Sequence, residues 1–266
     1  MVWLAVLVAL MLSGAMALAW RVALTTGQSG RIDAIWALAT GLAAVAAAGA
    51  SPGDPLRRAL VCAMAAAWSL RLGLALWRRA ISGGDDPRYA ALKQSWGAAA
   101  PRRLFLFLQF QAAASWPLAL TAYCAAGAPR PGLDGRDGLA IALFALAFAG
   151  EAIADQQMAE FKRAPGNRGR ICDHGLWAWS RHPNYFFEWL TWLAYPIMAV
   201  EAGYPAGWLA LAGPLVIYVL LVHVSGVPPL EAHLSRSRPA EFAAYAENVS
   251  AFWPRPPRRP RSFAKP

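Results

Sequence analysis

Acidic and basic side chains gather between residues 151 and 188 of a chain that is otherwise mostly apolar. Glu151, Asp155 and Lys162 are spaced by four and then seven residues, which places all three on one face of a helix. An exposed row of charges that only stabilises a helix would show the same spacing. This row, however, follows directly from an apolar segment and leads into further polar residues, so we expect the working site here.

Three arginines follow this face, on either side of a short loop. Arg168, Arg170 and Arg181 flank the loop, which contains Gly169 and Gly175. Guanidinium groups bind phosphate oxygens in pairs, and glycines let backbone amides approach an anion closely. The pattern therefore indicates an anionic ligand. A basic patch at the membrane surface explains the same residues equally well.

A carboxylate inside the next apolar segment is the strongest single signal in the sequence. Glu188 comes four residues after Asn184, so both project from one helical face. His182 and Pro183 precede them, and Pro183 suits the first turn of a helix, whose unpaired amides receive an anion or a carbonyl. A carboxylate one turn into a membrane helix rarely serves packing. We expect Glu188 to be functional.

Charged residues nearer the amino terminus are further candidates. Arg71 lies well inside an apolar segment, too far from its end to reach water comfortably, so a functional role is favoured. Asp33 stands where the second apolar segment begins, and a helix-capping role is favoured over lining a cavity. Arg88 and Tyr89 follow a predicted turn at Asp86. For Arg88, a solvated surface and contact with an anionic ligand are equally good interpretations.

Helices in a membrane must position these residues. The 266-residue chain is 58% hydrophobic, contains 13 Trp and has a mean hydropathy of +0.34, which is more apolar than a soluble domain needs. Apolar runs of about 18 residues or more are long enough to cross a bilayer as helices. We predict an all-α integral membrane protein with short terminal cytoplasmic helices and about seven spans, at residues 2–20, 33–50, 56–77, 104–127, 138–162, 184–200 and 206–224.

The distribution of basic residues predicts the orientation. Most Lys and Arg residues lie in the connections after the first, third and fifth spans and in the tail, so we expect these on the cytoplasmic side and the amino terminus outside. The first span is expected to be retained, because no positive residue precedes it as in a signal peptide. Topology also explains the net charge of +10, so nucleic acid is not an expected partner. The cysteines and histidines lack metal-ligand spacing, and no metal is expected.

The polar stretch also carries a family resemblance. It reads E-x-x-x-D, then a basic residue seven positions on, then G-L-W-x-x-S-R-H-P-N-Y-F-x-E. This pattern, within residues 150–254, resembles the carboxyl-terminal half of the membrane steroid 5α-reductase superfamily. It is closest to the bacterial DUF1295-type branch and more distantly similar to the sterol C14 reductases. The resemblance implies a multi-pass protein of the bacterial inner (plasma) membrane that binds NADPH.

The resemblance also implies which residues bind the cofactor. In that superfamily NADPH lies in the cytoplasmic half of the last spans, and terminal helices close over it. Together with the arginines of the basic loop, the expected cofactor-binding residues are Glu151, Asp155, Lys162, Arg168, Arg170, Arg181, His182, Asn184, Tyr185, Glu188, Glu231, His233 and Tyr245.

The implied reaction is reduction of a carbon-carbon double bond conjugated to a carbonyl, in a lipid-like or steroid-like substrate that enters from the bilayer. A donor must then stabilise the developing enolate oxygen. Arg71, Tyr89 and Asp33 are the candidates for this catalytic role, and Arg71 is favoured. Trp68 stands where the steroid enzymes have a tyrosine, which puts a steroid substrate in doubt.

One membrane domain, residues 1–254, is expected. Its helices in residues 1–127 would face the substrate, and residues 138–254 would form the cofactor-binding half. A basic, Pro-rich tail, residues 255–266, follows and is expected to be disordered and to associate with lipid headgroups.

Two alternatives stay open. The isoprenylcysteine carboxyl methyltransferases resemble the same half of the chain, including the R-H-P motif, and bind S-adenosylmethionine. Asn184 with Glu188 fits the reductases better, and Glu231 is single where the methyltransferases tend to have paired acids. A transporter or receptor comes third, because we find no internal repeat and the polar groups gather at the cytoplasmic mouth of the spans.

Overall fold

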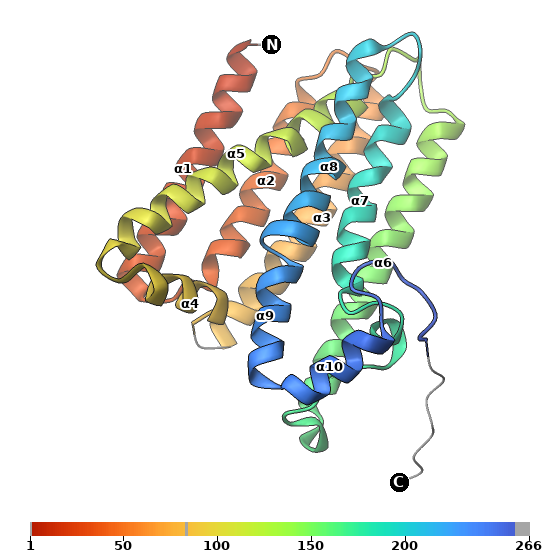
Figure 1. Ribbon diagram of the computed structural model, residues 1–266. Helices are drawn as coiled ribbons and strands as arrows, with labels where there is room; N and C mark the ends of the chain where they lie inside the picture. Colours follow the sequence, from red (N-terminus) through yellow and green to blue (C-terminus); the bar gives the residue numbers. More distant parts are fainter. Residues whose placement is uncertain (1, 83–84, 259–266) are drawn as a thin grey trace. The chain divides into compact units, whose positions relative to one another are not determined.

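Every regular element in the described residues, 2–82 and 85–258, of the computed structural model is a helix (Figure 1). The predicted all-α class is confirmed. The α-helices are α1 (Val2–Thr26), α2 (Arg31–Gly49), α3 (Pro55–Ser82), α4 (Pro87–Trp96), α5 (Ala100–Ala126), α6 (Gly135–Arg163), α7 (Pro183–Ala199), α8 (Ala212–Val219), α9 (Val227–Ser237) and α10 (Pro239–Asn248). Short 3₁₀ helices are η1 (Gly97–Ala99), η2 (Pro165–Asn167), η3 (Gly175–Ala178) and η4 (Pro205–Leu211), and η5 (Leu220–Val224) is a π-helical turn.

The described residues contain six helical stretches that are long and apolar enough to cross a membrane. The remaining predicted span, residues 184–200, forms α7, whose 17 residues are at the short end of the range for a membrane helix. The chain is therefore a multi-pass membrane protein, while its orientation and its membrane stay predictions. The six stretches are Val2–Thr26, Arg31–Gly49, Pro55–Ile81, Arg88–Ala126, Gly135–Arg163 and Pro205–Ser237.

The chain divides into two compact units. Unit 1 comprises residues 1–141 and 192–216, and unit 2 comprises residues 142–191 and 217–266. Helices α6, α7 and α8 each contribute residues to both units.

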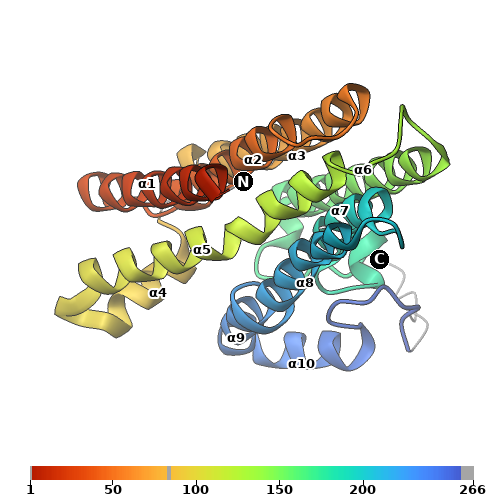
Figure 2. The same cartoon turned by 90° about the horizontal axis from the view of Figure 1, so that it is seen from above.

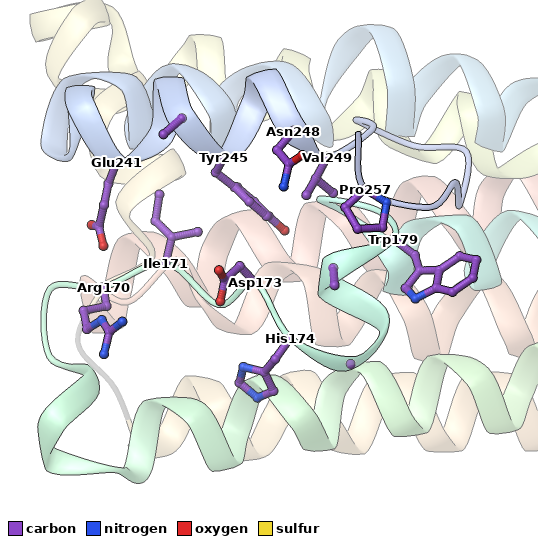
Figure 3. A pocket seen from close by; sticks show the side chains of 13 residues that line it. Arg170, Ile171, Asp173, His174, Trp179, Glu241, Tyr245, Asn248, Val249 and Pro257 are labelled. Carbon is purple, nitrogen blue, oxygen red and sulfur yellow. The ribbon is translucent and has the colours of Figure 1, made fainter. Parts of the chain in front are cut away.

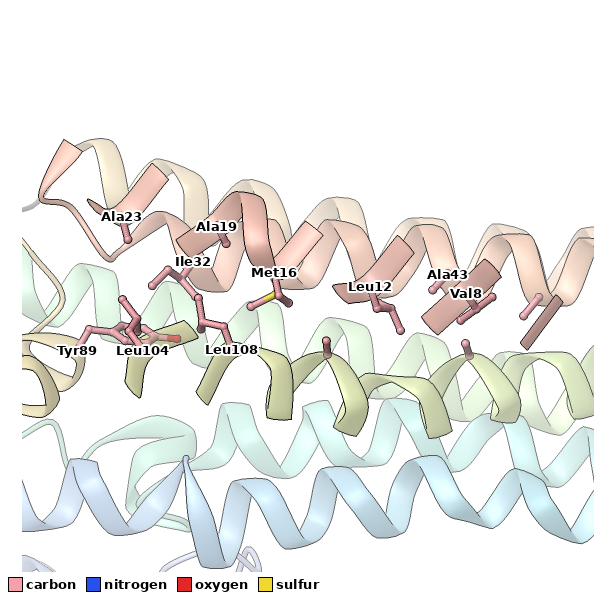
Figure 4. Packing of buried hydrophobic residues seen from close by; sticks show 13 residues of the cluster. Val8, Leu12, Met16, Ala19, Ala23, Ile32, Ala43, Tyr89, Leu104 and Leu108 are labelled. Carbon is pink, nitrogen blue, oxygen red and sulfur yellow. The ribbon is translucent and has the colours of Figure 1, made fainter. Parts of the chain in front are cut away.

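In unit 1, α2 packs against α1, α3 and α5, which Figure 2 shows from above. Small side chains permit this packing, since a Cβ on Gly41 of α2 would lie 2.0 Å from the Cβ of Ser69 on α3. A buried face of α1 repeats every three or four residues and faces α5 (Figure 4), which gives the unit its apolar core. Its buried members on the two helices include Val8, Leu12, Met16, Ala19, Ala23, Leu104 and Leu108.

A polar bond joins the same two helices. The hydroxyl of Ser13 on α1 donates to Oε1 of Gln109 on α5 at 2.6 Å. The amide of Gln109 donates in turn to the backbone carbonyl of Ser13 at 3.3 Å. These two hydrogen bonds link α1 to α5.

Arg57 holds the loop between α5 and α6. Its Nε and Nη2 donate to the two carboxylate oxygens of Asp137 at 2.9 Å each, and both side chains are fully buried. The remaining N–H groups donate to the backbone carbonyls of Ala128, Arg130 and Gly132. All five donors of the guanidinium therefore have acceptors, which is the condition under which a buried charge is tolerated.

Candidate functional site

The two units separate the two groups of predicted residues. All thirteen expected cofactor-binding residues belong to unit 2, and the three catalytic candidates belong to unit 1. We therefore describe each group within its own unit.

Along the charged face of α6, the exposure of the side chains increases towards the end of the helix. Glu151 is only 4% exposed, Asp155 is half-buried, and Lys162, in the last turn, is exposed. A row of charges that only stabilised a surface helix would not begin with a buried carboxylate, because burying an ionisable group is costly unless it is partnered. The structure therefore disfavours the interpretation of a simple exposed ladder for Glu151.

The same helix holds the polar loop that follows it. The amide of Leu176 donates to Oε1 of Gln157 at 2.9 Å, and the indole N–H of Trp177 donates to the carbonyl of Ala154 at 3.0 Å. Gly175, directly before Leu176, lies in the left-handed region, with φ of 58°. A Cβ at this position would lie about 2.5 Å from the Gln157 amide, so only glycine fits without movement.

Arg181, Glu231 and His182 form the best-connected polar cluster of unit 2. Arg181 donates through Nε and Nη2 to both carboxylate oxygens of Glu231, at 2.7 and 3.0 Å. Nε2 of His182 lies 3.1 Å from the same carboxylate. Glu231 belongs to α9, so the cluster fixes this helix against the residues that precede α7.

The other side of the Arg181 guanidinium binds the end of α10. Its Nη1 donates to the carbonyls of Ala246 and Val249, at 3.2 and 2.6 Å. Arg181 thus makes four hydrogen bonds to groups of the described residues. This arrangement gives Arg181 a positioning role beyond the phosphate-binding role expected from sequence.

The residues at the start of α7 are arranged around His182. Its ring is 4% exposed and stacks on Tyr185, with ring centroids 5.5 Å apart and planes 7° apart. As predicted, Pro183 occupies the first turn of the helix. Glu188, one turn further in, is 6% exposed, and Asn184 is half-buried. The buried carboxylate expected inside this helix is therefore present.

A groove of about 500 Å³ opens in unit 2 (Figure 3). Of the expected cofactor-binding residues, Arg170 and Tyr245 line it. The Tyr245 hydroxyl donates to the carbonyl of Trp177 at 2.7 Å, and burial raises the pKa of this phenol well above its usual value. Sequence reasoning missed the other polar and aromatic lining residues, which come from the loop and from α10: Asp173, His174, Trp179, Glu241 and Asn248.

Besides Lys162 and Arg170, two more expected cofactor-binding residues lie on the surface. Arg168 follows η2 and is exposed, and His233 on α9 is exposed as well. The exposure of Arg168 fits both interpretations of the arginines, phosphate binding and a basic patch at the membrane surface.

In unit 1, the structure brings Asp33 and Tyr89 together. The Tyr89 hydroxyl donates to Oδ1 of Asp33 at 2.8 Å, and Arg88 forms an ion pair with Oδ2. Arg88 also bonds to Asp86, so its guanidinium engages two acids of the protein.

The favoured capping role of Asp33 was wrong. Helix α2 begins two residues earlier, at Arg31, with Gly30 at the N-cap and no side-chain cap. Asp33 therefore lies inside the first turn, where its carboxylate reaches α4 instead of the first amides of its own helix. The predicted turn before α4 is confirmed, because Asp86 caps that helix by accepting from the amide of Arg88 at 2.9 Å.

Arg71 is half-buried on α3, one turn after Trp68. Trp68 is fully buried, and its ring meets those of Trp36 and Trp192 edge to face, at 6.3 and 4.9 Å between centroids. The indole N–H of Trp36 donates to Ser115 at 2.7 Å. Trp68 therefore lies among aromatic rings of unit 1.

Comparison with known proteins agrees with this helical, membrane-spanning architecture. The family model described as DUF1295, a protein of unknown function, matches residues 19–249, which covers most of both units. No curated protein and no solved structure matches the chain. The chain therefore belongs to the DUF1295 family, a family of steroid 5α-reductase-like proteins.

Proposed function

We propose that this protein reduces a carbon-carbon double bond conjugated to a carbonyl in a lipid-like substrate, with NADPH as the reductant. The observation that carries the proposal is the pair of buried carboxylates, Glu151 and Glu188, in unit 2. Both belong to helices that the sequence places in the membrane, where acids that serve only packing are rare.

The residues of unit 2 suit a dinucleotide. Buried carboxylates accept hydrogen bonds from amide and hydroxyl groups, and exposed cations at Lys162, Arg168 and Arg170 attract phosphates. When bound, NADPH would supply a hydride for the β-carbon of the conjugated double bond. Within the protein, Glu231 orients the ring of His182, and Arg181 holds α9 and α10 in place.

Reduction is completed when the enolate formed from the substrate takes up a proton. A donor near its oxygen lowers the barrier, because charge develops there in the transition state. Arg71 is our favoured donor, because it is a half-buried cation inside an apolar helix. Asp33 would hold the phenol of Tyr89 in one orientation, because it accepts the hydrogen bond of the Tyr89 hydroxyl.

A lipophilic substrate is consistent with the surface of unit 1. Large apolar side chains along α1, such as Leu7 and Leu10, are more than 60% exposed, as expected for helices that face lipid. We propose that the substrate reaches the enzyme from the bilayer of the plasma membrane.

The test is thermal stabilisation of the detergent-purified protein by NADPH and, separately, by S-adenosylmethionine. A ligand that binds only the folded state stabilises it, by about 2.7 kcal/mol at a hundred times its Kd. We expect stabilisation by NADPH alone. Stabilisation by S-adenosylmethionine alone would replace the reductase by a methyltransferase, and stabilisation by neither would leave the proposal without support.

Matched variants locate the ligand. Glu151→Gln and Glu188→Gln each remove a buried negative charge while keeping the side-chain shape, and we expect both to weaken the stabilisation by NADPH at least tenfold in ligand concentration. Glu160→Gln is the control, because Glu160 is exposed on the same helix as Glu151 and accepts a hydrogen bond from the amide of Gln156. If all three variants lost the stabilisation by NADPH equally, the cofactor-binding roles of Glu151 and Glu188 would be contradicted.

A further inference from the structure

The carboxyl-terminal segment 250–258, here called the strap, is held in place by backbone hydrogen bonds. The amide of Arg181 donates to the carbonyl of Ser250 at 2.8 Å, and the amide of Arg255 donates to the carbonyl of Trp179 at 2.9 Å. Ser180 is fully buried and donates through its hydroxyl to the carbonyl of Phe252 at 2.9 Å. The strap therefore pairs with residues 179–181, which lead directly into His182 and α7.

This finding changes the expectation for the tail. Residues 255–258, predicted as the start of a disordered segment, are bound to the rest of unit 2, since the amide of Arg258 also donates to the carbonyl of Asn248 at 3.1 Å. Residues 259–266, the remainder of the predicted tail, lie outside the described residues.

Aromatic side chains hold the strap against α7 and α8. Trp253 packs edge to face on Trp189 and lies near Phe186, with centroids 5.2 and 6.0 Å apart. Tyr218 of α8 contacts Phe252 at 5.5 Å. Phe186 and Trp189 belong to the first two turns of α7, where the predicted span begins, so the predicted topology puts the strap at the boundary of the membrane.

The outer face of the strap combines tryptophan and arginine. Trp253 is 41% exposed and Trp179, beside Arg255, is 48% exposed. The side chains of Arg255 and Arg258 are exposed as well, and the strap contains no acid. Exposed tryptophans are enriched at the level of lipid headgroups, and arginines there attract the phosphates of anionic lipids.

We propose that the strap is a binding surface for anionic lipid headgroups, and that this binding holds residues 179–181 in the conformation described. Arg255 and Arg258 supply the charge, and Trp253 supplies the interfacial anchor. The lipid thereby stabilises the segment that positions Arg181 and His182. The proposal does not depend on the proposed reaction, because it concerns only the strap and the lipid.

The experiment is hydrogen exchange of the whole protein in nanodiscs of phosphatidylcholine, with and without 30% phosphatidylglycerol. The amides of Arg181, Arg255 and Arg258 report on the strap, because each donates to a carbonyl across the strap contact. A cation near an anionic surface contributes about fivefold to binding, equivalent to about 1 kcal/mol. For two arginines we expect exchange to slow by about ten- to thirtyfold with phosphatidylglycerol.

A double variant and a matched control complete the design. Arg255→Gln with Arg258→Gln should abolish the difference between the two lipids, although exchange in phosphatidylcholine should also rise, because Nη1 of Arg258 donates to the carbonyl of Glu247 at 3.3 Å. Arg102→Gln with Arg103→Gln, two exposed arginines predicted on the same side of the membrane, should keep the difference. Equal exchange in both lipids overturns the proposal. A lipid effect that survives in the strap variant, or disappears in the control, overturns it as well.

Discussion

Both carboxylate oxygens of Glu231 accept hydrogen bonds from Arg181, which lies 50 residues earlier in the chain. The same guanidinium binds the last turn of α10 through Ala246 and the residue after that helix, Val249. Arg181 is therefore the residue through which α9, α10 and the start of α7 are joined.

We predict that Arg181→Lys lowers the stability of unit 2. An ammonium group cannot reproduce two parallel bonds to a carboxylate and two to carbonyls, because it lacks the planar fork. We expect a loss of up to about 3–5 kcal/mol, the range for breaking a buried pair. Thermal unfolding in detergent measures it, with Arg170→Lys as the control because Arg170 is exposed. Equal melting temperatures for the two variants would contradict the joining role.

Gly175→Ala should destabilise the loop between α6 and α7. Its φ of 58° costs a residue with a Cβ about 1–2 kcal/mol, and the added methyl would displace Gln157 from the amide of Leu176. Local hydrogen exchange at Leu176 measures the effect. Gly166→Ala is the control, because Gly166 has no positive φ and a Cβ there meets nothing within 4 Å. Unchanged protection of Leu176 would show that the loop tolerates the change.

Tyr245→Phe should lower the stability of unit 2 at the groove. The change removes the donor to the buried carbonyl of Trp177, which costs about 1–3 kcal/mol. Tyr218→Phe is the control, since it keeps ring contacts such as that with Trp189. Alkaline titration gives a second readout, because burial raises the pKa of Tyr245 in the fold. Stability from this phenol is full below the unfolded pKa of about 10 and is lost as pH rises above it. A Tyr245→Phe protein with wild-type stability and the same alkaline profile would refute this.

At acidic pH we expect the start of α4 to detach from the rest of unit 1. Burial acts to raise the pKa of Asp85, but its bonds from Lys93 and from the amide of Ser29 outweigh burial and lower it. This stability is therefore present above the unfolded pKa, about 4, and is lost as pH falls through the lower folded value. Limited proteolysis between pH 7 and pH 3 should show new cleavage near α4 at the acid end. Asp85→Asn should show that cleavage already at pH 7, and equal cleavage of both proteins at every pH would contradict the role of Asp85.

Local patterns in the sequence predicted the helices well. The extension of α6 to the residues around Lys162 and the turn at Asp86 that precedes α4 both follow from residues that are neighbours in the chain. The buried acid in α7 was also found from sequence, because a carboxylate in an apolar run has few structural explanations.

Contacts between distant residues were beyond such reasoning. The bond from Tyr245 to Trp177 joins residues 68 positions apart, and the pair of Asp33 with Tyr89 joins residues 56 apart. Nothing in the local pattern says which of several acceptors a donor will reach. Asp33 illustrates the error, since its position near a helix start suggested a cap while its partners lay on α4.

All five N–H groups of Arg57 have acceptors in the folded protein, and this has a consequence for its biosynthesis. Asp137 is synthesised 80 residues after Arg57, and the three carbonyls that also bind it come from residues 128–132. A charged group without these partners is expensive inside a bilayer. During translation Arg57 therefore lacks these partners until the chain up to Asp137 has been made, and we expect its guanidinium to stay in water until then.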